Sequence, residues 1–331
     1  MKKSLFLSIL MLVAGFATAQ KKGEQKEKRE SDKFRVENTK IIPKMDRLAI
    51  AQLVVHYKLT TTAKAVTQER SSMKIAGARV TAYLEFTDGD LTQENCQEIS
   101  DYFYSYFQKK LKAGGIDTVG WNTVTAHEFY QKVSDDEEPE EKKEKGGNEW
   151  MTANANNGKK LRNGMAGFAG NKGKRVVTFS EDTKAIIGFF ELTLDFADVM
   201  VNLDIKTRER KDIGGGWYYP EVTTTKYTWA INPEMRIGNP DNAAPLLSGT
   251  KGWPENIMMW NDIASTTPYH DVMSEDMSKA RSGLAKQFAF RKELTPVMIQ
   301  TTRAKYIVAA KKACEVYADA FVEMCQRNRK K

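Results

Sequence analysis

The fold is decided by one stretch, residues 78–119, which reads ARVTAYLEFTDGDLTQENCQEISDYFYSYFQKKLKAGGIDTV. Apolar and polar residues alternate in its first part, as in a half-buried strand, and the alternation stops at the turn Thr87–Asp90. An amphipathic helix is expected over Thr92–Ala113, because apolar residues recur there every three or four positions. The glycines at 114 and 115 end this helix, and a short strand follows over 116–119. The stretch therefore predicts a compact α/β unit.

The segments around this unit predict the elements that cover it. Residues 48–57 are apolar on both faces, which is typical of a central strand with helices on each side. Residues 198–208 and 223–231 alternate, and a glycine run lies between them, so they predict an antiparallel hairpin. A long amphipathic helix over 302–326 closes the chain. We expect an α/β (or α+β) fold with a mixed β-sheet flanked by amphipathic helices.

Two apolar segments are harder to interpret. Val176–Phe179 is short and β-branched and predicts a strand. Residues 183–196 show both helical and alternating character, so their structure stays open.

The first residues have the pattern of a secretory signal peptide. Lys2 and Lys3 precede the apolar run 5–14, and Ala17-Thr18-Ala19 forms a small-x-small cleavage signal before Gln20. The run is too short for a confident membrane span. We expect an exported protein without a transmembrane segment in the mature chain, located in the periplasm, at the outer membrane or outside the cell.

After the signal peptide (1–19), we expect a disordered charged arm over 20–35, because it lacks apolar periodicity. Residues 36–331 are expected to form a single α/β domain. Residues 134–174 are rich in charge, glycine and asparagine and predict a mobile insertion with little to bury.

Composition and cysteine content narrow the class of protein. The chain has 41% hydrophobic residues, which permits a sizeable core, and a formal net charge of +8. Much of the basic excess lies near the two ends, and export argues against a nucleic-acid partner. Three cysteines exclude a disulfide scaffold. Three buried thiols are favoured, and pairing of Cys96 with Cys314 or Cys325 stays open.

Three segments resemble motifs for metal or nucleotide binding, but each lacks a residue that the motif requires. His127-Glu128 lacks the second histidine of a zinc protease, and residues 88–99 lack the glycine and glutamate of a calcium loop. In the glycine-rich segment 167–174, Arg175 follows Lys174 where a phosphate-binding loop needs Ser or Thr. We therefore expect no metal and no cofactor. His56, at the polar end of its strand, is expected to be a hydrogen-bonded structural residue.

The order of elements resembles the α/β module of the curli production assembly family and of the TolB N-terminal domain. The resemblance lies in the strand 48–57, the helix 92–113 with its two glycines, the short strand 116–119, the later hairpin and the closing helix. The chain lacks the lipid-anchor cysteine of the curli family, and it inserts the charged segment 134–174. The resemblance implies a role in outer-membrane or secretion-related assembly.

Two functions are consistent with these observations. The first is a non-catalytic cell-envelope protein that binds another protein or a surface polymer. Trp217, Tyr218 and Tyr219 at the hairpin end are its candidate binding residues, because aromatic side chains on loops are common interface anchors. The alternative is a periplasmic or secreted hydrolase with a site near His270, although the Gly-x-Ser-x-Gly motif is missing.

Overall fold

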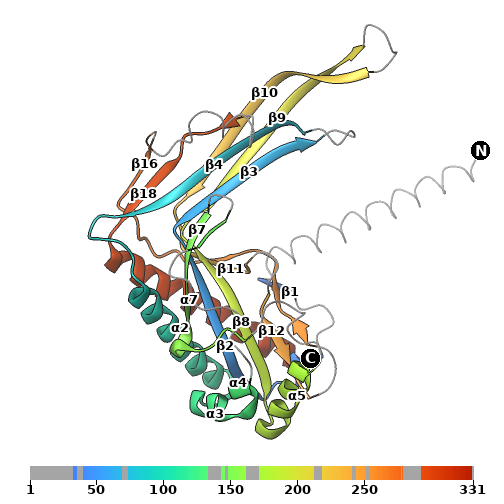
Figure 1. The fold of residues 1–331 in the computed structure, drawn as a ribbon, viewed down its shortest axis with the longest axis vertical. Coiled ribbons are helices and arrows are strands. Elements are labelled where there is room, and N and C mark those ends of the chain that lie inside the picture. The colour runs from blue at the N-terminus through green and yellow to red at the C-terminus, as the bar shows by residue number, and fades with distance from the viewer. Residues whose placement is uncertain are drawn as a thin grey trace, which may run out of the picture.

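Two parallel strands, β2 (Arg47–Lys58) and β8 (Ile186–Asp195), form the centre of an α/β body (Figure 1). The structure is a computed structural model that describes residues 33–35, 40–68, 74–132, 143–145, 148–161, 171–211, 218–240, 244–250, 254–276, 278 and 292–329. The described part of the main sheet has the order β13-β12-β8-β2-β7-β6, and β5 and β11 pair with β2 and β8. The remaining strands of this sheet are β5 (Asp117–Thr118), β6 (Lys143–Lys145), β7 (Asn148–Asn154), β11 (Arg236–Gly238), β12 (Leu246–Ser248), β13 (Glu255–Asn256) and β15 (Ile263–Ala264).

Helices cover both faces of this sheet. On one face, α2 (Gln93–Ala113) and α7 (Arg303–Arg329) pack on alternate residues of β2 and β8 in the larger core cluster. On the other face, α3 (Trp121–Ala126), α4 (Glu128–Lys132) and α5 (Asn171–Thr183) form a second cluster with Ala49 and Ile187. Two short 3₁₀ helices, η1 (Ile42–Lys44) and η2 (Ala155–Asn157), complete the helical elements described.

A bulge in β2 determines which residues face which helix layer. The register with β8 shifts between Ile50 and Gln52, so Ala51 is the extra residue. Leu48 and Ile50 before the bulge, and Leu53 and Val55 after it, all face the α2–α7 layer. The central strand is thus buried on both faces, as its sequence predicts.

Long strands form two arms that extend from this body (Figure 1). Strands β3 (Thr60–Gln68) and β4 (Lys74–Phe86) are antiparallel, and β16 (Val272–Glu275), β17 (Lys292–Glu293) and β18 (Val297–Thr301) complete their sheet. The second arm is the hairpin of β9 (Asp198–Lys211) and β10 (Tyr218–Asn232). Its base packs on the first arm through Ala78, Val80 and Val201.

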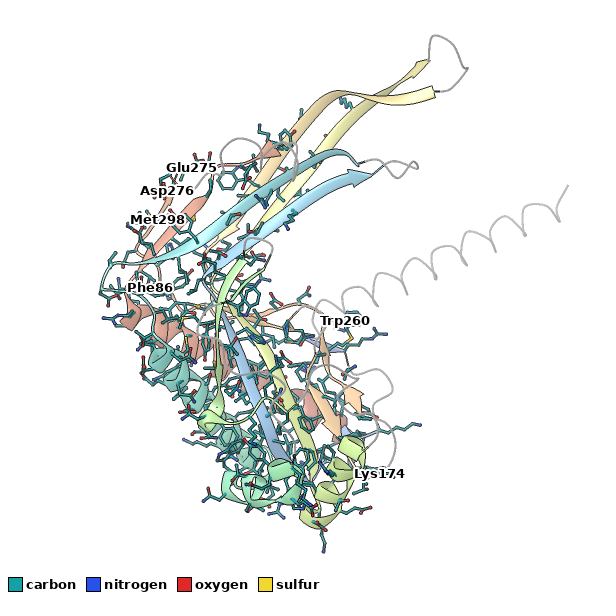
Figure 2. The ribbon with its side chains drawn as sticks, in the orientation of Figure 1. Phe86, Lys174, Trp260, Glu275, Asp276 and Met298 are labelled. Atoms are coloured by element: carbon teal, nitrogen blue, oxygen red, sulfur yellow. The ribbon has the colours of Figure 1, made fainter. Side chains whose placement is uncertain are left out.

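The first arm joins the body through aromatic packing at the end of β4. Phe86, which Figure 2 labels beside the helices, contacts Tyr306 of α7 edge-on, with ring centroids 5.4 Å apart. Strand β18 runs parallel to β4 and leads directly into α7, so the closing helix is anchored to both the arm and the body.

The expected fold class is confirmed: a mixed sheet, flanking helices, an antiparallel hairpin and a long C-terminal helix are all present. The helix expected from residue 92 is α2, and Thr92 caps it in a capping box with Asn95. The strand expected at Val176–Phe179 is wrong, because these residues lie within α5. Residues 183–196, left open, contain the whole of β8.

The last two residues of the charged arm expected over 20–35 form a strand of the folded protein. Phe34 and Arg35 form β1 (Phe34–Arg35), which pairs with β14 (Met258–Met259). Phe34 is buried edge-on against Tyr317 and Phe321, at 5.8 and 5.9 Å between ring centroids. Residues 1–32, including the expected signal peptide, lie outside the described residues.

One part of the insertion expected over 134–174 is packed into the body, contrary to the expectation of little to bury. Residues 148–154 form β7, which pairs antiparallel with the open edge of β2. Met151, Ala153 and Leu161 are buried in the two core clusters. Residues 133–142, 146–147 and 162–170 of this region lie outside the described residues.

Candidate functional site

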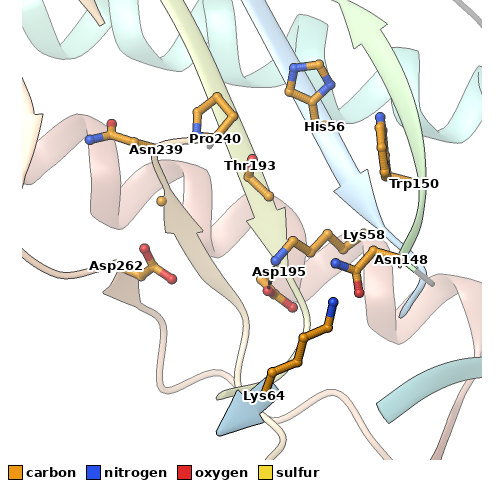
Figure 3. Close-up of a pocket in the computed structure, with 11 residues that line it drawn as sticks. His56, Lys58, Lys64, Asn148, Trp150, Thr193, Asp195, Asn239, Pro240 and Asp262 are labelled. Carbon is orange, nitrogen blue, oxygen red and sulfur yellow. Dashed lines mark hydrogen bonds and ion pairs between the residues drawn. The ribbon is translucent and has the colours of Figure 1, made fainter. Parts of the chain in front are cut away.

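A cavity of about 380 Å³ lies where β2 and β8 end and the two arms begin (Figure 3). Binding sites of α/β proteins commonly lie at the carboxyl ends of parallel strands. Here β2 supplies His56 and Lys58, and β8 supplies Thr193 and Asp195. The position follows from topology, because both parallel strands leave the sheet at this edge to become arm strands.

The first charged pair in the cavity wall joins the two central strands. Lys58 Nζ lies 2.6 Å from Asp195 Oδ2. Thr61 Oγ1 donates to the other carboxylate oxygen of Asp195 at 2.6 Å, and the Ala197 backbone N–H donates to it at 3.3 Å. Both oxygens of this buried carboxylate therefore have partners, and its charge is matched by Lys58.

The second pair lies across the cavity. Arg236 Nη2 lies 3.0 Å from Asp262 Oδ2, and Arg236 Nη1 pairs with Asp198. The pKa of Asp262 is raised, because the cavity walls remove water from the carboxylate and Asp195 and Asp198 add negative charge, which Arg236 only partly offsets. A Cβ atom at Gly238 would lie 2.1 Å from Asp262 Oδ1, so only glycine permits this approach.

A chain of polar side chains lies behind His56. Its Nε2 is 3.0 Å from Glu191 Oε1, and its Nδ1 is 2.9 Å from Thr152 Oγ1. Lys160 Nζ reaches the same Glu191 oxygen at 3.2 Å. Burial by itself would raise the pKa of Glu191, but His56 and Lys160 outweigh it and lower the pKa. Both ring nitrogens of His56 are engaged, which fixes the ring and supports the expected structural role.

Two asparagine side chains also line the cavity. Asn148 Oδ1 and Asn239 Oδ1 are buried, and neither accepts a hydrogen bond within the described part of the chain. Trp150 and Pro240 add apolar surface to the wall, and Trp150 comes from β7, in the segment expected to be a mobile insertion. The cavity thus combines two paired carboxylates, two amide groups and one aromatic ring.

The aromatic residues proposed from sequence lie elsewhere. Tyr218 and Tyr219 begin β10 and pair with Lys211 and Arg210, at the far end of the hairpin from the body (Figure 1). Trp217 lies outside the described residues. The structure therefore places Tyr218 and Tyr219 at the end of a hairpin, as expected, and does not bring them to the cavity.

His270 does not form the centre of a triad among the residues described. Its Nδ1 is buried without a hydrogen-bond partner there, and its ring packs against Tyr269. The adjacent Asp271 instead pairs with Lys305 of α7. His127 pairs with Asp182, 3.0 Å away. No group of three or more His, Cys, Asp or Glu suited to a metal ion occurs in the described ranges.

The cavity residues were missed from sequence, although one signal points to part of them. His56, Lys58 and Asp195 are polar residues at the ends of apolar strands, which is where α/β proteins place ligand-binding groups. Asn239 and Asp262 carry no such signal, because they follow short strands in a proline-rich region.

Comparison of the chain with protein-family models, with curated proteins and with solved structures finds no match.

Proposed function

We propose that the protein is an exported, non-catalytic protein of the cell envelope that binds a protein partner through the β9–β10 hairpin. The observation that carries this proposal is the length of the hairpin. Its ladder runs from the pair Asp198–Asn232 to the pair Lys211–Tyr218. At ~3.3 Å per residue, the 14 residues of β9 extend roughly 45 Å.

A two-stranded ribbon of this length needs a covering surface, since isolated hairpins are marginally stable in water. Among the side chains that the structure describes, the apolar contacts with the first arm lie near the base of the hairpin, around Val199, Val201 and Ile231. Among the described strands, β9 and β10 pair only with each other. Their outer edges therefore offer backbone N–H and C=O groups that a partner strand can use.

The proposed location rests on the sequence. Lys2-Lys3, the apolar run 5–14 and Ala17-Thr18-Ala19 have the pattern of an export signal. No helix in the described part of the chain has both the length and the apolar character that a bilayer crossing requires. An envelope protein of this type binds proteins or surface polymers rather than nucleic acid.

The contacts of His270 favour binding over the hydrolase alternative. A general base needs a nucleophile within hydrogen-bond reach and a group that orients its ring. Neither contact is present for His270 among the described residues, and Asp271 pairs with Lys305. We therefore retain binding as the proposed function.

Truncation of the aromatic residues at the hairpin end tests this function. We expect Trp217→Ala and Tyr218→Ala to leave the melting temperature unchanged and to weaken partner binding about 30-fold each, equivalent to ~2 kcal/mol for an interface anchor. The partner is first identified by mass spectrometry after cross-linked co-purification from native envelopes. Its affinity for each purified variant is then measured by calorimetry.

Thr228→Ala is the matched control, because Thr228 is exposed nearer the base of the same strand. We expect this variant to bind like the wild type. The proposal is wrong if both aromatic variants stay folded and retain wild-type affinity. A large loss of stability in Trp217→Ala would instead assign that ring to the core.

A further inference from the structure

The two carboxylates in the wall of the cavity at the ends of β2 and β8 are already paired with cations. These carboxylates, Asp195 and Asp262, lie 2.6 and 3.0 Å from Lys58 and Arg236. A charged ligand would compete with these pairs, and separating a partly buried pair leaves an uncompensated charge. The electrostatics of the wall therefore favour a neutral ligand.

The amides of Asn148 and Asn239 favour a ligand rich in hydroxyl groups. Each has a buried oxygen that accepts no hydrogen bond among the described residues, and a buried acceptor without a donor costs ~1–3 kcal/mol. Rotation about Cβ–Cγ exchanges the amide oxygen and nitrogen, so each side chain can present a donor or an acceptor to the cavity. A hydroxyl group both donates and accepts, and it satisfies either orientation.

Trp150 and Pro240 supply the apolar part of the wall. Figure 3 shows Trp150 and Asn148 on one side of the cavity, and Asn239 and Asp262 on the other. A pyranose ring has hydroxyl groups around its rim and C–H groups on its faces, so it suits an aromatic ring combined with planar amide and carboxylate groups. The cavity, at about 380 Å³, lies within the ~300–1,000 Å³ typical of small-molecule sites.

We infer that this cavity is a binding site for a neutral saccharide ring. Trp150 packs against one face of the sugar, and Asn148, Asn239 and Asp262 hydrogen-bond its hydroxyl groups. Gly238 lets Asp262 reach its position beside the strand backbone. The site is separate from the hairpin end, so sugar binding and partner binding can fail independently.

The test uses the full chain labelled with 5-fluorotryptophan and titrated with glucose, galactose, N-acetylglucosamine and the disaccharides maltose and lactose. The chain has six tryptophans, and Trp150→Phe assigns the resonance of Trp150. We expect at least one sugar to shift the Trp150 signal in a saturable way, with a dissociation constant of about 0.1–1 mM.

Variants then separate a built site from a general surface effect. We expect Asn239→Ala to weaken binding about tenfold, and Gly238→Ala to do the same because its methyl group displaces the Asp262 carboxylate. Both Trp150 variants lack the labelled reporter, so their sugar binding is measured by calorimetry. Trp150→Ala should abolish binding, whereas Trp150→Phe keeps an aromatic face and retains part of it. Thr228→Ala, on the hairpin, should bind sugar as the wild type does.

Three results would overturn this inference. The first is a Trp150 signal that no sugar shifts at concentrations up to ~20 mM, well above the expected dissociation constant. The second is binding that survives Asn239→Ala and Trp150→Ala unchanged. The third is saturable binding of propylamine or acetate in place of every sugar, which would show that the site selects charge. The first measurement uses the wild-type chain, and the conservative variant Trp150→Phe serves only to assign its signal.

Discussion

At the scale of single residues, Glu191 shows how a charge is maintained inside the sheet. It lies on a central strand and is buried, yet His56 and Lys160 keep its pKa below the ordinary value of 4.5. Lys160 and Thr152, which complete this group, both come from the segment expected to be a mobile insertion. The insertion therefore contributes polar partners that the central strands require.

We predict that Glu191→Gln lowers the free energy of unfolding by ~3 kcal/mol at pH 7, because it removes the carboxylate that balances the buried charge of Lys160. A carboxylate with a depressed pKa in the folded state adds stability above its unfolded pKa, and this stability is lost as the pH falls through the folded pKa. The wild type should thus lose its advantage over the variant as the pH falls below the ordinary glutamate pKa of 4.5. Urea unfolding above and below this pKa measures both effects.

Glu128→Gln is the control for this pH dependence, because Glu128 forms an exposed ion pair with Lys132 on α4. We expect no measurable change in its unfolding midpoint, since exposed pairs contribute little. The proposed role of the carboxylate would be contradicted if wild type and Glu191→Gln had the same unfolding midpoint at pH 7 and lost stability equally as the pH falls.

At the scale of elements, the contact between α2 and α7 holds the larger core together. Its interior is aromatic, with Phe103 and Phe107 of α2 edge-on to Tyr317 of α7 at 5.8 and 6.3 Å between ring centroids. Its margin is polar, where the Tyr102 hydroxyl donates to Glu315 at 2.5 Å. Tyr102 and Tyr106 thus lie at the polar margin of a buried face and join α2 to Glu315 and Asp319 of α7.

We predict that Gly114→Ala destabilises this contact by about 2 kcal/mol, because an added Cβ would lie 2.4 Å from Val322 Cγ1 of α7. Gly114 has a φ of −79°, so the loss comes from crowding and not from backbone strain. Adding Val322→Ala removes the clashing methyl group, and the double variant should be more stable than additivity of the two single variants predicts. Chemical denaturation of all four proteins gives the coupling energy.

Gly120→Ala provides the comparison, because a Cβ there would meet no atom within 4 Å. We expect its stability to change by less than about 1 kcal/mol. If Gly114→Ala behaves in the same way, then the helices separate at little cost and the contact is looser than the structure indicates.

At the scale of the whole molecule, one buried ion pair fastens the first arm to a segment far along the chain. Arg79 of β4 donates from Nη2 to both oxygens of Glu293 on β17, at 2.8 and 2.9 Å. The two side chains are 4% and 7% exposed, so little water screens them. The pair fixes the register of the parallel strands β4 and β17.

We predict that Arg79→Leu lowers the free energy of unfolding by about 3–5 kcal/mol, because it leaves the Glu293 carboxylate buried without a partner. The double variant Arg79→Leu/Glu293→Leu should recover most of this loss, since apolar side chains of similar volume tolerate burial. Equilibrium unfolding of the two single variants and the double variant checks the coupling. A double variant no more stable than Arg79→Leu would show that the arm depends on shape and not on charge at this point.

The sequence by itself determined the elements whose pattern is local and long. Sequence patterns predicted the apolar stripe of α2 with its Thr92 cap, the apolar run of β2, and the alternating hairpin strands β9 and β10. Helix and strand periods repeat over ten or more residues in these elements, which makes them predictable. The three cysteines are buried free thiols, as the sequence analysis favoured. Burial raises the pKa of the Cys96 thiol to about 12.

Only the tertiary structure decided the conformation of the short and polar segments. Val176–Phe179 is too short for its period to distinguish strand from helix. Its Phe179 stacks on Phe129 in the second core cluster, and the segment lies in α5. Residues 148–154 become a strand because β2 offers an unpaired edge. The cavity needs Lys58, Asp195, Asn239 and Asp262 together, and these residues meet only after the parallel strands end at one edge of the sheet. Such proximity depends on contacts between distant residues, which no local pattern encodes.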